Sequence, residues 1–134
     1  MAHEVLFFCI AQSASAADFA DDIRSAISER LETAVFGPIE VGDTWVERDI
    51  RSSNSDTPIS LESHLGGEVV AMESRRVANE PGGDAVTGRN WLLKVTLSGS
   101  VVDWDLFGVI WRVAEDRFSG IPYDEIDGFD VSLD

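Results

Sequence analysis

The stretch from Asn90 to Phe118 constrains the fold more than any other part of the chain, because it holds three of the four tryptophans and a long apolar run. Within it, Trp91–Leu97 alternates its side chains between two faces, as a strand does. A Ser-Gly-Ser turn follows, and Ser100 with Asp103 fits the pattern that caps the start of a helix. The sequence therefore predicts a strand and then a helix over about Val101–Arg117.

Large apolar side chains recur in this helix every three to four residues, so most of its circumference is expected to be buried. The main stripe contains Trp104, Phe107, Trp111, Ala114 and Phe118. We expect Trp104, Phe107 and Trp111 to be largely buried against the preceding strand. This pair of elements is the predicted centre of the core.

The N-terminal part predicts a second strand and a second helix. Val5–Ala11 is short and rich in β-branched and aromatic residues, which favours a strand buried on both faces. Ser15 and Asp18 form a helix start signal. The helix is predicted over about Ala16–Thr33, with an apolar stripe at steps of four residues that consists of Phe19, Ile23, Ile27 and Leu31.

The middle of the chain predicts strands separated by long connections. One strand is expected at about Thr44–Ile50, with Trp45, Glu47 and Asp49 sharing one face. Arg51–Gly67 is polar and rich in serine, which predicts a long, weakly packed loop.

A further strand is predicted at Glu68–Val77, because Val69 and Val70 begin an alternating pattern. Asn79–Asn90 is expected to be a flexible connection into the next strand. After the second helix, the alternation of Phe129, Val131 and Leu133 predicts a last strand.

This order of elements predicts one α+β domain over residues 1–134. Its class is a split β-α-β-β-α-β (ferredoxin-like) sandwich, in which two helices lie on one face of a mostly antiparallel sheet of four to five strands. Such a fold supports many unrelated functions, so the function has to be inferred from individual residues.

The charge of the chain narrows the classes of partner. With 10 basic and 25 acidic side chains the formal net charge is -15. Such a charge repels phosphate backbones, which argues against nucleic-acid binding and favours a basic protein partner. A host with a high-salt cytosol or a GC-rich genome is the alternative explanation for the acidity.

Cellular location is predicted from cysteine content and from hydropathy. The single Cys9 lies in an apolar run and has no partner for an internal disulfide, which fits a reducing compartment. The chain lacks an apolar run of the length that spans a bilayer. A cytoplasmic protein without membrane association is therefore expected.

Sequence motifs of catalysis are missing. The chain has no Walker loop, dinucleotide-binding glycine motif, zinc-protease motif, paired-cysteine motif or serine-hydrolase motif. His3 and His64 are far apart in sequence, which is weak material for a zinc site. We therefore predict no catalytic residue, no cofactor and no metal, and a non-enzymatic protein is favoured.

Two functional hypotheses remain. The first is an acidic binding protein that covers a basic site on a protein partner, in the manner of small inhibitors and immunity proteins. Its predicted contact surface is the C-terminal segment, where acids and aromatic residues alternate in a way that suits an interface. The residues concerned are Tyr123, Asp124, Glu125, Asp127, Phe129 and Asp130.

The second hypothesis is a small-ligand sensor or a small enzyme. Its pocket is expected between the sheet and the long loop, with Arg75, Arg76 or Arg89 holding an anionic group. A third possibility is that the charge only reflects the host. The oligomeric state is left open by the sequence.

Overall fold

Three α-helices and seven strands form the protein in a computed structural model that describes residues 2–98, 101–129 and 131. In chain order the elements are β1 (Ala2–Cys9), α1 (Ala16–Arg30), β2 (Ala34–Phe36), β3 (Glu40–Val41), β4 (Trp45–Ser52), β5 (Ile59–Leu65), α2 (Gly67–Val77), a 3₁₀ turn at Gly83–Val86, β6 (Trp91–Ser98), α3 (Trp104–Phe118) and β7 (Ile121–Asp124).

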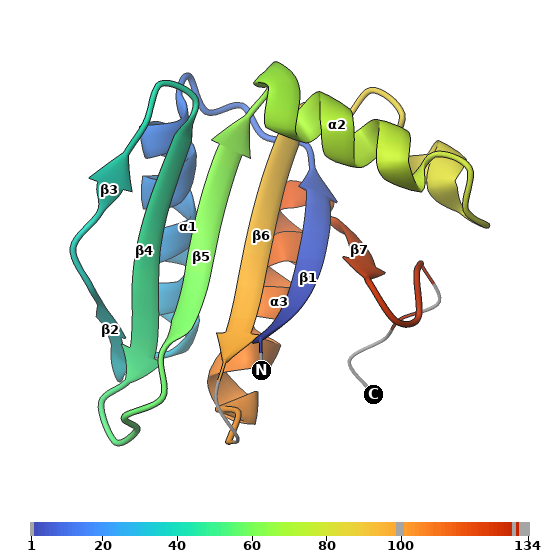
Figure 1. Cartoon of the computed structure of the whole chain (residues 1–134). Helices are drawn as coiled ribbons and strands as arrows, with labels where there is room; N and C mark the ends of the chain where they lie inside the picture. Colours follow the sequence, from blue (N-terminus) through green and yellow to red (C-terminus); the bar gives the residue numbers. More distant parts are fainter. Residues whose placement is uncertain (1, 99–100, 130, 132–134) are drawn as a thin grey trace.

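The strands form one open sheet in the order β2-β4-β5-β6-β1-β7, with β3 paired to the outer side of β4 (Figure 1). Every pair of neighbouring strands is antiparallel. β1 lies inside the sheet between β6 and β7, and its residues Val5–Cys9 are all buried. The predicted strand with two buried faces is therefore confirmed over Val5–Cys9, although β1 ends at Cys9 and Ile10 is 55% exposed.

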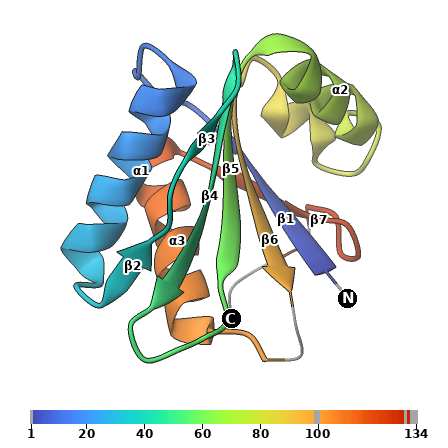
Figure 2. The same ribbon diagram turned by 60° about the vertical axis from the view of Figure 1, so that its left-hand side comes forward.

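Helices α1 and α3 cover one face of the sheet, and α2 lies on the other (Figure 2). The main core forms between the sheet and helices α1 and α3. Each of these helices begins at a capping side chain: Ser15 accepts from the N–H of Asp18, and Asp103 accepts from the N–H of Leu106, both at 3.1 Å. Asp103 is thus the N-cap itself, and α3 begins at Trp104, three residues later than predicted; Ser100 lies outside the described residues.

The aromatic stripe of α3 is buried in two of the three positions expected. Phe107 and Trp111 are 5% and 3% exposed, and the Trp111 ring meets the edge of Phe7 with centroids 5.2 Å apart. Trp104, which was expected to be buried, is 65% exposed. The prediction fails there because the helix begins at Trp104, whose ring lies at the rim of the core against Phe107.

α2 packs on one end of the second face, where it crosses the ends of β5, β6 and β1 (Figure 1). Its Val70 and Val77 lie over a small second core that includes Leu6, Phe8 and Leu92. The two valines are seven residues apart and so share one side of a helix. The rest of this sheet face is left without a covering helix.

Two of the predicted elements are wrong. Arg51–Gly67 is not a long loop, since it contains β5, which is hydrogen-bonded to β4 and β6 along its length. Glu68–Val77 is not a strand but most of α2. The predicted connection Asn79–Asn90 has the 3₁₀ turn inside it.

The fold is α+β with a mostly antiparallel open sheet, as predicted, but the sheet has seven strands instead of four to five. The ferredoxin-like topology is not confirmed: β2 and β3 add further strands beside β4, and a third helix, α2, follows β5 and lies on the face opposite α1 and α3 (Figure 2). The last described strand is β7 (Ile121–Asp124), which precedes in the chain the strand predicted from Phe129, Val131 and Leu133. Phe129 lies in a turn, and Leu133 lies outside the described residues.

Candidate functional site

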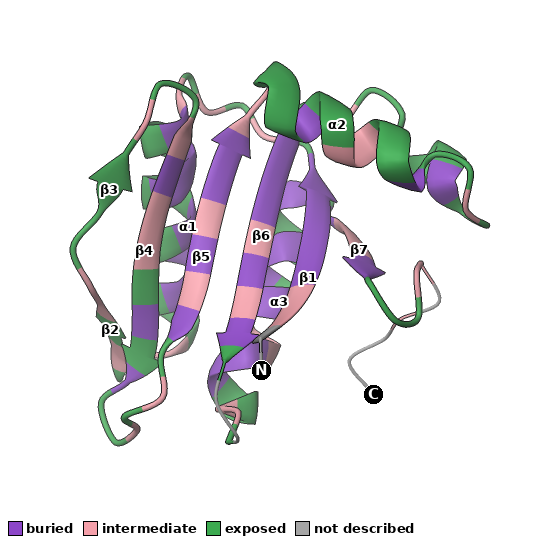
Figure 3. Ribbon diagram, in the orientation of Figure 1, coloured by how far each residue is buried: buried purple, intermediate pink, exposed green. Residues whose placement is uncertain are grey.

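The half of the second sheet face that α2 leaves open is polar and strongly acidic. Along β4, β5 and β6, half-buried and exposed positions interrupt the buried ones (Figure 3). Because side chains alternate along a strand and the register of each pair is known, the residues of this open face can be assigned. They are Glu4, Val35, Glu40, Trp45, Glu47, Asp49, Arg51, Ser60, Glu62, His64, Lys94 and Thr96.

Three glutamates lie side by side across this face. Glu40 of β3 is directly opposite Glu47 of β4, and Glu47 is directly opposite Glu62 of β5. Like charges at directly opposed positions of an antiparallel pair destabilise the sheet. Within the described residues, neither Glu40 nor Glu47 takes part in an ion pair. We call Glu40, Glu47 and Glu62 the acidic row.

The electrostatic cost of the acidic row is visible at its middle member. The pKa of Glu47 is raised above its ordinary value, first by partial burial and then by the charges of Glu62, Glu40 and Asp49. Lys94 is opposite Glu62, but its Nζ lies 3.3 Å from Oε2 of Glu4. The single lysine of the chain thus pairs with Glu4 on β1 and not with Glu47.

His64 borders the acidic row and is 5% exposed. Its Nε2 lies 3.4 Å from Oε1 of Glu62, but the two groups are not aligned as a hydrogen bond, and neither ring nitrogen has a hydrogen-bond partner among the described residues. The neighbouring imidazole is the largest influence that holds the pKa of Glu62 below its ordinary value. Trp45, directly opposite His64 on β4, is half-buried and adds an aromatic side chain.

The acidic row gives a direct prediction for stability. Because the pKa of Glu47 is raised on folding, its charge opposes folding, and this effect is absent below the ordinary value of 4.5 and grows as the pH rises through the raised value. Glu47→Gln is therefore expected to increase the free energy of unfolding by about 0.2–1 kcal/mol at pH 7. Urea unfolding at pH 7 and pH 4 measures this gain, which should shrink at pH 4; a loss of stability at pH 7 would contradict it.

The predicted C-terminal contact residues occupy different environments. Tyr123 is 4% exposed and Asp124 is 7% exposed. The neighbouring carboxylate of Glu80, followed by burial, raises the pKa of the Tyr123 hydroxyl. Its ring packs against Phe129, which is half-buried, with centroids 4.9 Å apart. These two aromatic residues are brought together, but as part of the small second core.

Asp124 holds a turn together. Its carboxylate accepts from Nε2 of His3 at 2.7 Å and from the N–H of Ile126 at 2.7 Å. Burial alone would raise the pKa of Asp124, but these two donors outweigh it and the pKa is lowered. Glu125 and Asp127 are exposed, and Asp130 lies outside the described residues. The C-terminal segment thus offers a partner acidic side chains without an exposed aromatic anchor.

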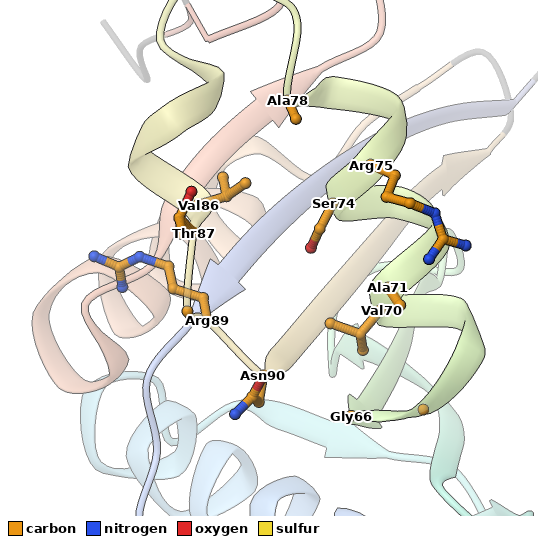
Figure 4. A pocket seen from close by; sticks show the side chains of 12 residues that line it. Gly66, Val70, Ala71, Ser74, Arg75, Ala78, Val86, Thr87, Arg89 and Asn90 are labelled. Atoms are coloured by element: carbon orange, nitrogen blue, oxygen red, sulfur yellow. The ribbon is translucent and has the colours of Figure 1, made fainter.

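The arginines of the alternative hypothesis are near a groove of about 470 Å³ between α2 and the loop after the 3₁₀ turn (Figure 4). Arg75 and Arg89 line this groove, but their guanidinium groups point away from each other (Figure 4). Arg89 donates to the carbonyl of Ser119 at 2.6 Å. Arg76 is outside the groove, where it donates twice to Glu73 at 3.1 Å. The three arginines therefore do not converge on one anion.

Other reactive groups give no sign of chemistry. Cys9 is buried in β1, and burial raises the pKa of its thiol to about 12, so that it stays protonated and unreactive at neutral pH. In the described part of the chain no three His, Cys, Asp or Glu side chains are placed to hold a metal ion. Over the same residues, no helix has both the length and the apolar character needed to cross a bilayer.

Comparisons with protein-family models, with curated proteins and with solved structures found no match to this chain.

Proposed function

We propose that the protein is a non-enzymatic binding protein that covers a basic site on a partner protein with the open, acidic half of its sheet. The observation that supports this most directly is the acidic row. Glu40, Glu47 and Glu62 oppose one another on adjacent strands at a cost to stability, and a cationic partner would turn that cost into binding energy. The site differs from the C-terminal segment that the sequence favours.

Both the whole chain and the local site support a basic partner. The net charge of -15 steers a cationic protein toward the molecule from a distance. At the site itself, Trp45 beside the acidic row provides an aromatic surface against which a cation can also rest. This mode of action is that of an inhibitor, and the buried free thiol of Cys9 supports a reducing compartment such as the cytoplasm.

The proposal predicts how binding responds to salt. A short arginine-rich peptide should bind ¹⁵N-labelled protein with an affinity that falls steeply between 0.05 M and 0.5 M NaCl. Exposed charges that are farther apart than the Debye length, about 10 Å at 0.1 M, are largely screened, and this length shrinks as salt is added. The amide shifts should change most along β3, β4 and β5. Shifts spread evenly over every acidic region, or confined to Glu125 and Asp127, would contradict the proposed site.

Binding should also depend on pH in a defined direction. Glu47 must be ionised to hold a cation, and its pKa is raised by burial and by Glu62, Glu40 and Asp49. Affinity is therefore expected to fall as the pH is lowered, beginning at a higher pH than for an isolated glutamate. Peptide titrations by calorimetry from pH 8 to pH 4 measure this; constant affinity would contradict it.

A second candidate function is the binding of a small anionic molecule in the groove beside α2. The observation in its favour is the groove volume of about 470 Å³, which is in the range of ligand sites. Arg75 would have to turn toward the groove, since its guanidinium points outward (Figure 4). Thermal unfolding with a panel of phosphates and carboxylates tests this, with Arg75→Gln as the variant that should abolish any stabilisation.

A further inference from the structure

We infer that the partner presents an α-helix, with arginines on one side of it, that lies across the strands of the open sheet face. This rests on the proposed function and adds to it the secondary structure and the residue type of the partner. The acidic row supplies the charge, and His64 supplies an independent sign that the face is incomplete in the free protein.

The spacing of the acidic row favours a helix. Neighbouring strands lie about 4.8 Å apart, so Glu40, Glu47 and Glu62 follow one another at about that interval. Side chains at positions i and i+4 of a helix are about 5–6 Å apart. Residues on one face of an extended strand are about 6.8 Å apart. A helix laid across the strands can therefore place successive side chains near successive glutamates. An extended segment has a longer repeat, so that its third side chain no longer lies near the third glutamate.

The fold already contains a helix in this orientation. α2 crosses the strands on the same face, toward the ends of β5, β6 and β1 (Figure 1). It leaves β3 and β4 uncovered, and the acidic row begins on these two strands. A partner helix could thus lie beside α2 at an ordinary helix spacing of about 8–10 Å, and would complete a layer that α2 begins.

His64 favours arginine over lysine. A buried polar side chain without a hydrogen-bond partner is uncommon, and His64 is 5% exposed with both ring nitrogens unpaired among the described residues. Its Nε2 lies 3.4 Å from Oε1 of Glu62 without forming a hydrogen bond to it. A guanidinium group has several donors in a planar fork. A guanidinium that binds Glu62 could also donate to His64, which a single ammonium group does less well.

Three stapled helical peptides of about 18 residues test the inference. The first has arginines at positions i, i+4 and i+8, so that they share one side. The second has the same composition with the arginines distributed around the helix, and the third has lysines in place of the one-sided arginines. Affinities are measured by calorimetry at 0.05 M NaCl, and the bound site is mapped by amide shifts.

The one-sided arginine peptide should bind at least about tenfold more tightly than the distributed one, with the lysine peptide in between. The amide shifts it causes should lie at Glu40, Glu47 and Glu62. Equal affinity of the first two peptides would overturn the helix while leaving the proposed function standing. Equal affinity of the arginine and lysine peptides would overturn the role of His64. If none of the three binds, the proposed function fails as well.

Discussion

Replacing Trp111 by alanine is expected to lower the free energy of unfolding by about 3–5 kcal/mol, as for large aromatic residues deleted from other protein cores. Trp111 is 3% exposed and meets Phe7 and Phe107 edge to face, with centroids 5.2 Å and 5.7 Å away. Its removal leaves a cavity between α3 and the centre of the sheet, where β1 cannot move to fill it. Chemical denaturation followed by far-UV circular dichroism measures the loss.

Trp104 provides a matched control on the same helix. It is 65% exposed, so Trp104→Ala removes the same number of atoms but little buried surface, and its cost should be below about 1 kcal/mol. Two variants with equal losses would contradict the packing of α3. A Trp111→Ala variant too unstable to purify can be replaced by Trp111→Phe, which should lie between the wild type and alanine.

The double substitution Glu47→Gln and Glu62→Gln is expected to weaken binding of a basic peptide by at least about tenfold, because it removes the two adjacent charges at the centre of the acidic row. The same substitutions relieve the repulsion between opposed glutamates. Glu62→Gln also removes a charge that His64 and Lys94 stabilise, since the pKa of Glu62 is lowered on folding. The two effects oppose each other, so the stability of the variant should stay close to that of the wild type while its binding weakens. A variant that lost binding through misfolding would instead be less stable, so urea unfolding distinguishes the two cases.

A control with the same change in net charge separates the site from general electrostatics. Glu32 follows α1 and Glu115 lies on α3, and both are exposed. Glu32→Gln with Glu115→Gln should slow association slightly, through weaker steering, and leave the dissociation rate unchanged. Surface plasmon resonance with an immobilised arginine-rich peptide distinguishes the two effects. Equal losses of affinity in the two double variants would reduce the interaction to net charge and reject the acidic row as a site.

The elements with a dense apolar pattern could be predicted from sequence. β1, α1, β6 and α3 were located to within a few residues, because each buries large side chains at the period of its secondary structure. Their spatial arrangement could not be predicted. The antiparallel position of β1 between β6 and β7 results from contacts over long sequence separations, which leave no local pattern.

β5 and α2 were missed for different physical reasons. In β5 the buried positions alternate as Ile59, Leu61 and Ser63, but the third of them is a serine. The apolar pattern is therefore short and lies within a polar stretch of sequence. In α2, Val69 and Val70 favour a strand by propensity, and Val70 and Val77 are its two buried residues. With so small a buried stripe, tertiary packing decides the conformation and the intrinsic preference is overridden.

Part of the candidate site could be predicted from the sequence. Trp45, Glu47 and Asp49 could be assigned to one face of a strand from alternation alone. Their opposition to Glu62 depends on the register between β4 and β5, and β5 was not recognised as a strand. At the C-terminus, the mixture of aromatic and acidic residues suggested an interface, but Tyr123 is an internal residue because β7 pairs it with Leu6.

The position of β1 inside the sheet affects how the chain is made in a cell. Cys9 pairs with Trp91 and Val5 pairs with Asp124, so both neighbours of β1 are translated long after it. At about 5–20 residues per second, Trp91 follows Cys9 by roughly 4–16 s. During that delay the apolar run Val5–Cys9 has no strand on either side and is open to association with other nascent chains. The yield of folded protein should therefore depend on chaperones that shield the emerging N-terminal segment, however stable the finished molecule is.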